Sequence, residues 1–248
     1  MLGSRAIEKI EYGLENVPQF RFPDHSELAG APLRSTYLSE MISAHDALKR
    51  LKDGNKRYAT EAHSYESFSF EKQRIDLLEG QSPFAVILGC SDSRVPAELV
   101  FDQGLGDLFV VRVAGNVAAP SQIGSVEFAV SELGTRLVVV MGHANCGAVI
   151  AALNKVQNPK GKLTPSLFRL IERIQPAVES VLAENPSTEI STLIPDIIKA
   201  NVLSNLKRMR TESEVISRYE AEEGLLIVGA EYCLQTGQVE FFDPSESK

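Results

Sequence analysis

Two short apolar runs, each ending in glycine and followed by a residue type that commonly binds metals, constrain the fold of this chain most strongly. Residues 84–89 lead into Cys90, and residues 137–142 lead into His143. Short, largely β-branched runs of this kind are typical of strands buried on both faces of a parallel sheet. The carboxyl ends of parallel strands meet at one edge of the sheet, where open α/β sheets usually bind ligands. We therefore expect Cys90 and His143 to lie close together.

The rest of the chain alternates predicted strands and helices. Further buried strands are expected at residues 107–114 and 224–230, an edge strand at 238–242, and helices at 43–58, 121–133, 145–153, 164–183 and 191–217. Strands and helices that alternate with short links are typical of parallel, doubly wound sheets. We predict one α/β domain, with a central, mostly parallel β-sheet that has one antiparallel edge strand and is flanked by helices.

The first 40 residues differ from the remainder. Residues 1–40 mix charged residues with several prolines and have too little apolar content to form a core of their own. We predict a short helix and an irregular arm that packs on the chain's own core or on a partner subunit. Residues 41–248 are then the α/β domain.

Composition and charge exclude several classes of protein. A hydrophobic content of 44% and a charged content of 23% are those of a soluble globular protein. The net charge of −8 argues against nucleic acid as a partner. No apolar run approaches the ~18 residues that a membrane span needs. The three cysteines do not suggest a disulfide framework, and no secretory signal is recognised, so a reducing, cytoplasmic location is expected.

Cys90, His143 and Cys146 form the predicted metal centre. His143 and Cys146 stand three positions apart at the start of a predicted helix, so both side chains can turn toward one ion. Two thiolates and one imidazole are typical of a zinc site whose fourth position is open for chemistry. The alternative is that both cysteines are ordinary buried residues. Their neighbouring glycines and strand ends favour the metal centre, whereas Cys233 lacks a nearby acid or histidine and is expected to be an ordinary buried cysteine.

Asp92 and Arg94 decide between a catalytic and a structural metal. Alternation along an extended segment would place Asp92 and Arg94 on the same side as Cys90. Arg94 can then hold the Asp92 carboxylate in a charge-assisted pair, which leaves the fourth position to water. Zinc lowers the pKa of its water from ~15.7 toward ~7, so hydroxide would attack a small electrophile. If the pair breaks, Asp92 coordinates zinc and closes the site; the alternative is a plain structural salt bridge.

The ordered motifs Cys90-x-Asp92-x-Arg94 and His143-x-x-Cys146-Gly147 resemble those of the β-class carbonic anhydrases, and the resemblance extends over about residues 44–242. It implies reversible hydration of carbon dioxide to bicarbonate and a proton. By this resemblance, one zinc ion binds Cys90, His143 and Cys146, and Asp92 and Arg94 form a gate at the metal.

The resemblance also implies a substrate cleft and an assembly. Gln81 would direct its amide into the cleft, Phe109 would line an apolar pocket for carbon dioxide, and Gly147 would lie beside them. The resemblance allows Gln81 and Phe109 to come from a partner subunit. It implies a homodimer or a tetramer, with the arm at residues 1–40 available for contacts between subunits.

Two other functions remain open. The first is hydrolysis of a related cumulene, such as carbon disulfide or carbonyl sulfide, which would use identical zinc ligands. The second is a non-catalytic zinc protein in which Asp92 closes the site permanently. Gln81 and Arg94 count against the second, because an inactive protein has less physical reason to keep a residue that pulls Asp92 off the metal.

Overall fold

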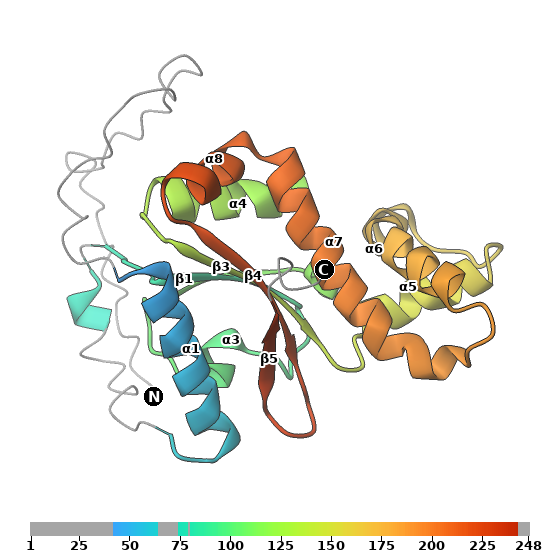
Figure 1. Cartoon of the computed structure of the whole chain (residues 1–248), viewed down its shortest axis with the longest axis horizontal. Coiled ribbons are helices and arrows are strands. Elements are labelled where there is room, and N and C mark those ends of the chain that lie inside the picture. Colours follow the sequence, from blue (N-terminus) through green and yellow to red (C-terminus); the bar gives the residue numbers. More distant parts are fainter. Residues whose placement is uncertain (1–41, 64–73, 79, 243–248) are drawn as a thin grey trace, which may run out of the picture. The chain divides into compact units, whose positions relative to one another are not determined.

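A five-stranded sheet forms the centre of the structure, a computed structural model that describes residues 42–63, 74–78 and 80–242 (Figure 1). The strand order is β2-β1-β3-β4-β5. The strands are β1 (Ala85–Gly89), β2 (Leu108–Arg112), β3 (Leu137–His143), β4 (Leu226–Tyr232) and β5 (Val239–Phe242). The first four are parallel, and β5 pairs antiparallel with β4. The predicted sheet, mostly parallel with one antiparallel edge strand, is confirmed.

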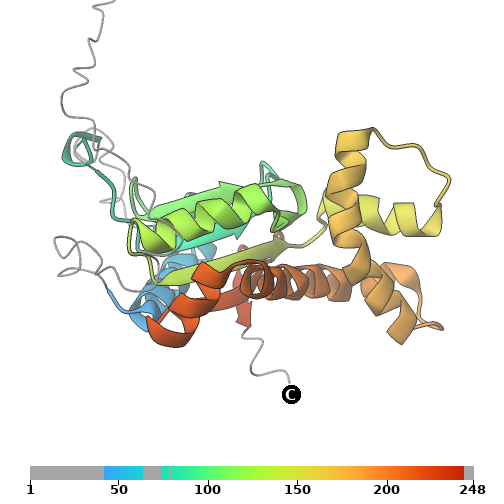
Figure 2. The same cartoon turned by 90° about the horizontal axis from the view of Figure 1, so that it is seen from above.

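Helices cover both faces of the sheet. They are α1 (Ala44–Ala59), α3 (Ala97–Val100), α4 (Pro120–Ser131), α5 (Gly147–Gln157), α6 (Pro165–Glu184), α7 (Ile194–Glu212) and α8 (Glu214–Glu222), with short 3-10 turns η4 (Ala114–Asn116) and η5 (Ile190–Leu193). Helices α1 and α3 lie on one face, and α4, α7 and α8 lie on the other. Helices α5 and α6 lie beside α7 and away from the sheet in both views (Figures 1 and 2). Among the described residues, no helix has the length and apolar character needed to cross a membrane.

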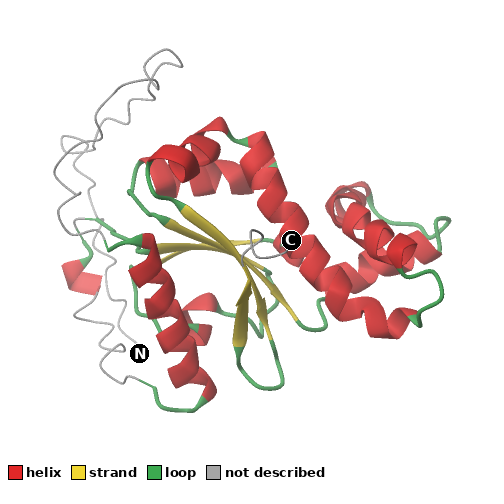
Figure 3. Ribbon diagram, in the orientation of Figure 1, coloured by secondary structure: helices red, strands yellow, loops and turns green. Residues whose placement is uncertain are grey.

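Strands β1 and β3 are buried along their whole length, as the apolar runs predict. Both are inner strands of the sheet, which Figure 3 shows in yellow between the helices. Alternate residues of β3, such as Val139 and Met141, join the core that includes residues of α1 and α3. Gly142 faces the other way, toward α7, and a Cβ there would lie 2.8 Å from a methyl group of Val202. The glycine before His143 therefore allows α7 to pack directly against the carboxyl end of β3.

One of the predicted helices is interrupted in the structure. Residues 191–217 do not form one helix, because the chain breaks at Ser213 between α7 and α8. The Ser213 hydroxyl accepts the backbone N–H of Ile216 at 3.0 Å and so caps the start of α8, which a serine does well in an extended conformation. The predicted arm at residues 1–40 lies outside the described residues and stays a prediction.

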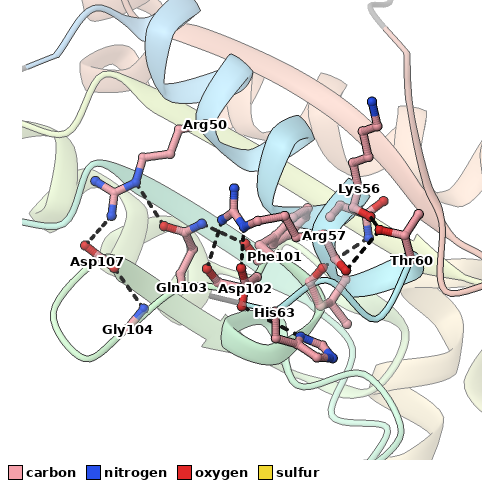
Figure 4. Close-up of polar contacts among 12 residues, drawn as sticks. Arg50, Lys56, Arg57, Thr60, His63, Phe101, Asp102, Gln103, Gly104 and Asp107 are labelled. Carbon is pink, nitrogen blue, oxygen red and sulfur yellow. Dashed lines mark hydrogen bonds and ion pairs between the residues drawn. The ribbon is translucent and has the colours of Figure 1, made fainter. Parts of the chain in front are cut away.

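Ionic contacts join α1 to the segment that leads into β2 (Figure 4). Arg57 donates to the carboxylate of Asp102, whose side chain is fully buried. Arg50 donates to Asp107 at 2.7 Å and to Gln103 at 2.9 Å. A buried carboxylate needs such a charged partner, so these contacts fix α1 on the core of its own chain.

Candidate metal centre

The carboxyl ends of β1 and β3 bring the three predicted ligands together. Cys90 follows β1, His143 is the last residue of β3, and Cys146 precedes the first turn of α5. Their ligand atoms all lie within 4.8 Å of one another, and the two Sγ atoms are 3.9 Å apart. All three residues are buried. The structure thus collects these side chains at one point, while their binding of a metal stays a prediction.

A tight turn between β3 and α5 sets the directions of His143 and Cys146. Asn145 adopts a left-handed conformation with φ of 55°, which asparagine tolerates better than most residues. The backbone N–H of Ala144 donates to Tyr232 of β4 at 2.9 Å and holds the turn against the sheet. Cys146 is the N-cap of α5, where the free N–H groups of the first turn favour a negative charge. The turn therefore presents an imidazole and a sulfur on the same side.

The imidazole of His143 has one nitrogen ready for a metal. Nδ1 lies 3.0 Å from the carbonyl oxygen of Ala144, which can only accept, so Nδ1 carries the proton. Nε2 consequently keeps its lone pair. It is buried and has no hydrogen-bond partner among the described residues. A cation held between Nε2 and the sulfurs of Cys90 and Cys146 would satisfy this lone pair.

The electrostatics of the two thiols also favour a cation. A hydrogen bond from Cys146 lowers the pKa of Cys90 to about 4, against the effect of burial. The same bond to Cys90, together with burial, raises the pKa of Cys146. Burial lowers the pKa of His143, but the nearby sulfur of Cys90 and its negative charge outweigh that effect and raise the pKa. The thiol of Cys90 thus ionises readily, whereas that of Cys146 ionises only against repulsion from the first thiolate. A divalent ion would relieve this repulsion. Two sulfurs and one nitrogen are a donor set that suits zinc.

Asp92 and Arg94 lie beside the three ligands, but for a different reason from the one expected. Arg94 donates to both carboxylate oxygens of Asp92, from Nε at 2.9 Å and from Nη2 at 2.7 Å. Asp92 Oδ2 is 3.8 Å from His143 Nε2. The segment is not extended: Asp92 Oδ1 also accepts the backbone N–H of Arg94 at 3.0 Å, and Val95 donates to the Asp92 carbonyl. A turn, not strand alternation, therefore makes the predicted pair.

Two further contacts of Cys90 join it to segments distant in the sequence. Arg112, the last residue of β2, donates to the carbonyl oxygens of Cys90 at 3.0 Å and Asp92 at 2.6 Å. The backbone N–H of Gly115 in η4 donates to Cys90 Sγ at 3.3 Å. The glycine itself signals a special turn after the strand, whereas no local pattern marks Arg112 as the support of the segment.

Comparisons with known proteins agree on one family. The family model described as Carbonic anhydrase matches residues 85–239. Carbonic anhydrase 2 of Mycobacterium tuberculosis is 40% identical over 193 residues, which cover 77% of this chain and 89% of that protein. The β-carbonic anhydrase CafA of Aspergillus fumigatus has a similar structure, with a TM-score of 0.64, 29% identity and coverage of 82% of this chain and 93% of that one. The chain belongs to the β-carbonic anhydrase family.

A second β-carbonic anhydrase structure resembles the chain at the level of the fold. It is one of two tetrameric enzymes from Sordaria macrospora, with a TM-score of 0.61 and 26% identity, and the match covers 80% of this chain and 95% of that one. The family therefore includes members that resemble this chain and assemble as tetramers.

The three predicted cleft residues of this β-carbonic anhydrase are not all near the ligands. Gly147 begins α5 directly after Cys146 and is exposed. The space beside it is open, because a Cβ added there would have no atom within 4 Å. Phe109 pairs with Val86, four residues before Cys90, so about 13 Å of strand separates the two. Gln81 is exposed and precedes β1 altogether. Within one chain, Gln81 and Phe109 thus lie toward the opposite end of the strands from the metal centre.

Proposed function

We propose that this β-carbonic anhydrase binds one zinc ion through Cys90, His143 and Cys146 and hydrates carbon dioxide reversibly to bicarbonate and a proton. Carbon dioxide hydration is the general activity of the family. The observation that carries the zinc assignment is the buried, unpartnered Nε2 of His143 beside two sulfurs. Zinc, when bound there, would supply a Lewis acid that lowers the pKa of a water molecule toward about 7.

Asp92 and Arg94 have distinct roles in this proposal. Hydrogen bonds from Arg94 hold the pKa of Asp92 well below its usual range, so its carboxylate is an acceptor at neutral pH. Asp92 then accepts a hydrogen bond from the attacking water and so orients a lone pair of that water toward carbon dioxide. Arg94 occupies both oxygens of Asp92 and so prevents the carboxylate from becoming a fourth ligand.

Gln81 and Phe109 are proposed to act across a subunit interface. In their own chain both lie toward the amino ends of the strands, far from Cys90. A homodimer, or a tetramer such as the one named for the Sordaria macrospora enzyme, can supply them from the partner subunit. The amide of Gln81 and the ring of Phe109 would then line the cleft beside Gly147.

The test compares metal content and hydration in matched variants. Cys90→Ala and His143→Ala are expected to lose zinc and activity together. Cys233→Ala removes a half-buried thiol outside the cluster and should keep both. Stopped-flow hydration between about pH 6.5 and 9 should rise with pH in the parent protein.

Two outcomes would contradict the proposal. A protein that holds one zinc ion per chain but hydrates no carbon dioxide at any pH would point to the closed site or to a cumulene hydrolase. Assays with carbon disulfide and carbonyl sulfide then separate those two. Full zinc content in Cys90→Ala would refute the ligand assignment.

A further inference from the structure

Two buried asparagines of α7 contact the segment at residues 115–118, whose Gly115 donates to Cys90. Asn201 and Asn205 are each 1% exposed and lie four residues apart, on one face of the helix. Asparagine is a poor helix former, and a buried amide costs free energy unless its polar atoms are hydrogen-bonded. The hydrogen bonds of these two amides therefore indicate their role in the structure.

The two side chains form a directed chain of hydrogen bonds. The backbone N–H of Ala118 donates to Asn205 Oδ1 at 2.7 Å. Asn205 Nδ2 lies 2.8 Å from the Asn201 carbonyl and 3.2 Å from Asn201 Oδ1. Asn201 Nδ2 donates to the carbonyl of Gly115 at 2.9 Å. Because the chain of hydrogen bonds begins at an N–H and ends at a C=O, each side chain must offer one acceptor and one donor, which an ionised aspartate cannot do.

The turn held by Asn201 is the one that contacts Cys90. Gly115 donates its N–H to Cys90 Sγ at 3.3 Å, while its carbonyl accepts from Asn201. Gly115 has a φ of 70° and Asn116 a φ of 45°, so two successive residues are left-handed. Such a turn persists only where its surroundings fix it. Asn201 thus binds the carbonyl of Gly115, the same residue whose N–H donates to the sulfur of Cys90.

We propose that Asn201, oriented by Asn205, is a positioning residue of the metal centre: it fixes Gly115 so that its N–H stays on the sulfur of Cys90. The inference rests on the proposed binding of zinc by Cys90. A hydrogen bond to a coordinating sulfur withdraws electron density from it and restrains its direction. Without the bond, the sulfur is more electron-rich and less well placed.

The test replaces the donor without changing the size of the side chain. In Asn201→Asp, a carboxylate oxygen faces the Gly115 carbonyl in place of the Nδ2 donor. The dissociation constant for zinc, measured by competition with a chromophoric chelator, should rise by about 10- to 100-fold. In the cobalt-substituted protein, the sulfur-to-cobalt charge-transfer band should move to longer wavelength. A general loss of stability would not produce that shift.

Asn55→Asp is the matched control. Asn55 is 5% exposed and donates to Val100 and Gly237, so its replacement also buries a carboxylate, but at α1. It should leave the cobalt band and the zinc affinity unchanged. If Asn201→Asp does not fold, Asn201→Ala removes the same donor without adding a charge and is expected to shift the band in the same direction.

The outcomes separate this inference from the proposed function. If the parent protein binds zinc tightly and the Asn201 variants show the same affinity and the same cobalt band, the positioning role is overturned and the proposed function stays intact. Equal effects of Asn201→Asp and Asn55→Asp overturn it as well. Parent protein that binds no zinc overturns both.

Discussion

In the proposed function, Arg94 keeps the carboxylate of Asp92 away from the metal. It is half exposed, and its contact with Asp92 lies at the surface, so it contributes little to folding stability. Its effect is local: both Asp92 oxygens are occupied while Oδ2 remains 3.8 Å from His143 Nε2. In the proposed function, this single exposed side chain would decide whether Asp92 is available as a fourth protein ligand.

Arg94→Ala is therefore expected to fold normally and to keep its zinc. Hydration should fall about 100-fold or more, because Asp92 is no longer restrained and no longer orients water. Zinc content, thermal midpoint and stopped-flow rates measured on one preparation test this. Arg169→Ala, at an exposed position of α6, is the control and should match the parent. Full activity of Arg94→Ala would disprove the gate even with the zinc ligands correct.

The residues that could be predicted from the sequence are those that lie close together along the chain. Cys90, Asp92 and Arg94 follow one strand, while His143 ends another and Cys146 comes three residues later, so local spacing marks both groups. Contacts that join distant segments leave no such mark: Arg112 reaches Cys90 across 22 positions, and Asn201 reaches Gly115 across 86. Tertiary packing alone brings those pairs together.

The 3-10 turn η4 requires a glycine at position 115. A Cβ at Gly115 would lie 2.6 Å from Cδ1 of Ile174, and φ is already 70°. Gly115→Ala should lower the free energy of unfolding by about 1–3 kcal/mol and weaken zinc binding. At Gly124 in α4, an added Cβ would have no atom within 4 Å, so Gly124→Ala should raise the free energy of unfolding by about 0.5–1 kcal/mol. Urea denaturation measures both, and equal stability of Gly115→Ala and the parent would contradict the argument.

The pairing of β4 with β5 places two acids opposite each other. Glu231 of β4 faces Glu240 of β5, and burial together with the Glu240 charge raises the pKa of Glu231. A raised pKa means that the folded state favours the protonated carboxyl. The protonated Glu231 carboxyl therefore contributes to stability fully below the unfolded pKa of about 4.3, and this contribution is lost as the pH rises through the pKa of the folded state.

Glu231→Gln cannot ionise and so keeps that contribution at every pH. The variant should be more stable than the parent at about pH 7, by roughly 0.2–1 kcal/mol, and equal to it near about pH 4. Chemical denaturation at several pH values measures the difference. Glu98→Gln, at an exposed position of α3, is the control. A gain that is constant with pH would show that ionisation of Glu231 is not the cause.

The elements themselves could be predicted well where the apolar pattern is strong. The runs that became β1 and β3 are apolar at every position, so their burial on both faces could be predicted. The sequence does not predict the break at Ser213, because the apolar pattern continues across it from α7 into α8. The deciding interactions are the cap on Ile216 and the bond from Ser213 to Glu127 of α4, a partner 86 positions away.

At the scale of the whole molecule, one chain separates the groups that the proposed cleft needs. β1 lies between Gln81, which precedes it, and Cys90, which follows it. Phe109 packs instead against Phe128 of α4, with ring centroids 6.2 Å apart. If Gln81 and Phe109 act in catalysis, the functional unit must contain a second copy of the chain.

Mixed assemblies of two defective chains test this requirement. Gln81→Ala should keep zinc but lose the cleft amide, whereas Cys90→Ala should lose zinc but still offer Gln81. Each variant alone is expected to be nearly inactive. In a two-fold dimer formed by co-refolding equal amounts, half of the dimers are mixed and each has one complete site, so activity should return to about a quarter of the parent value. Mixed dimers that form, as judged by differently tagged subunits, yet remain inactive would place Gln81 outside the partner's cleft.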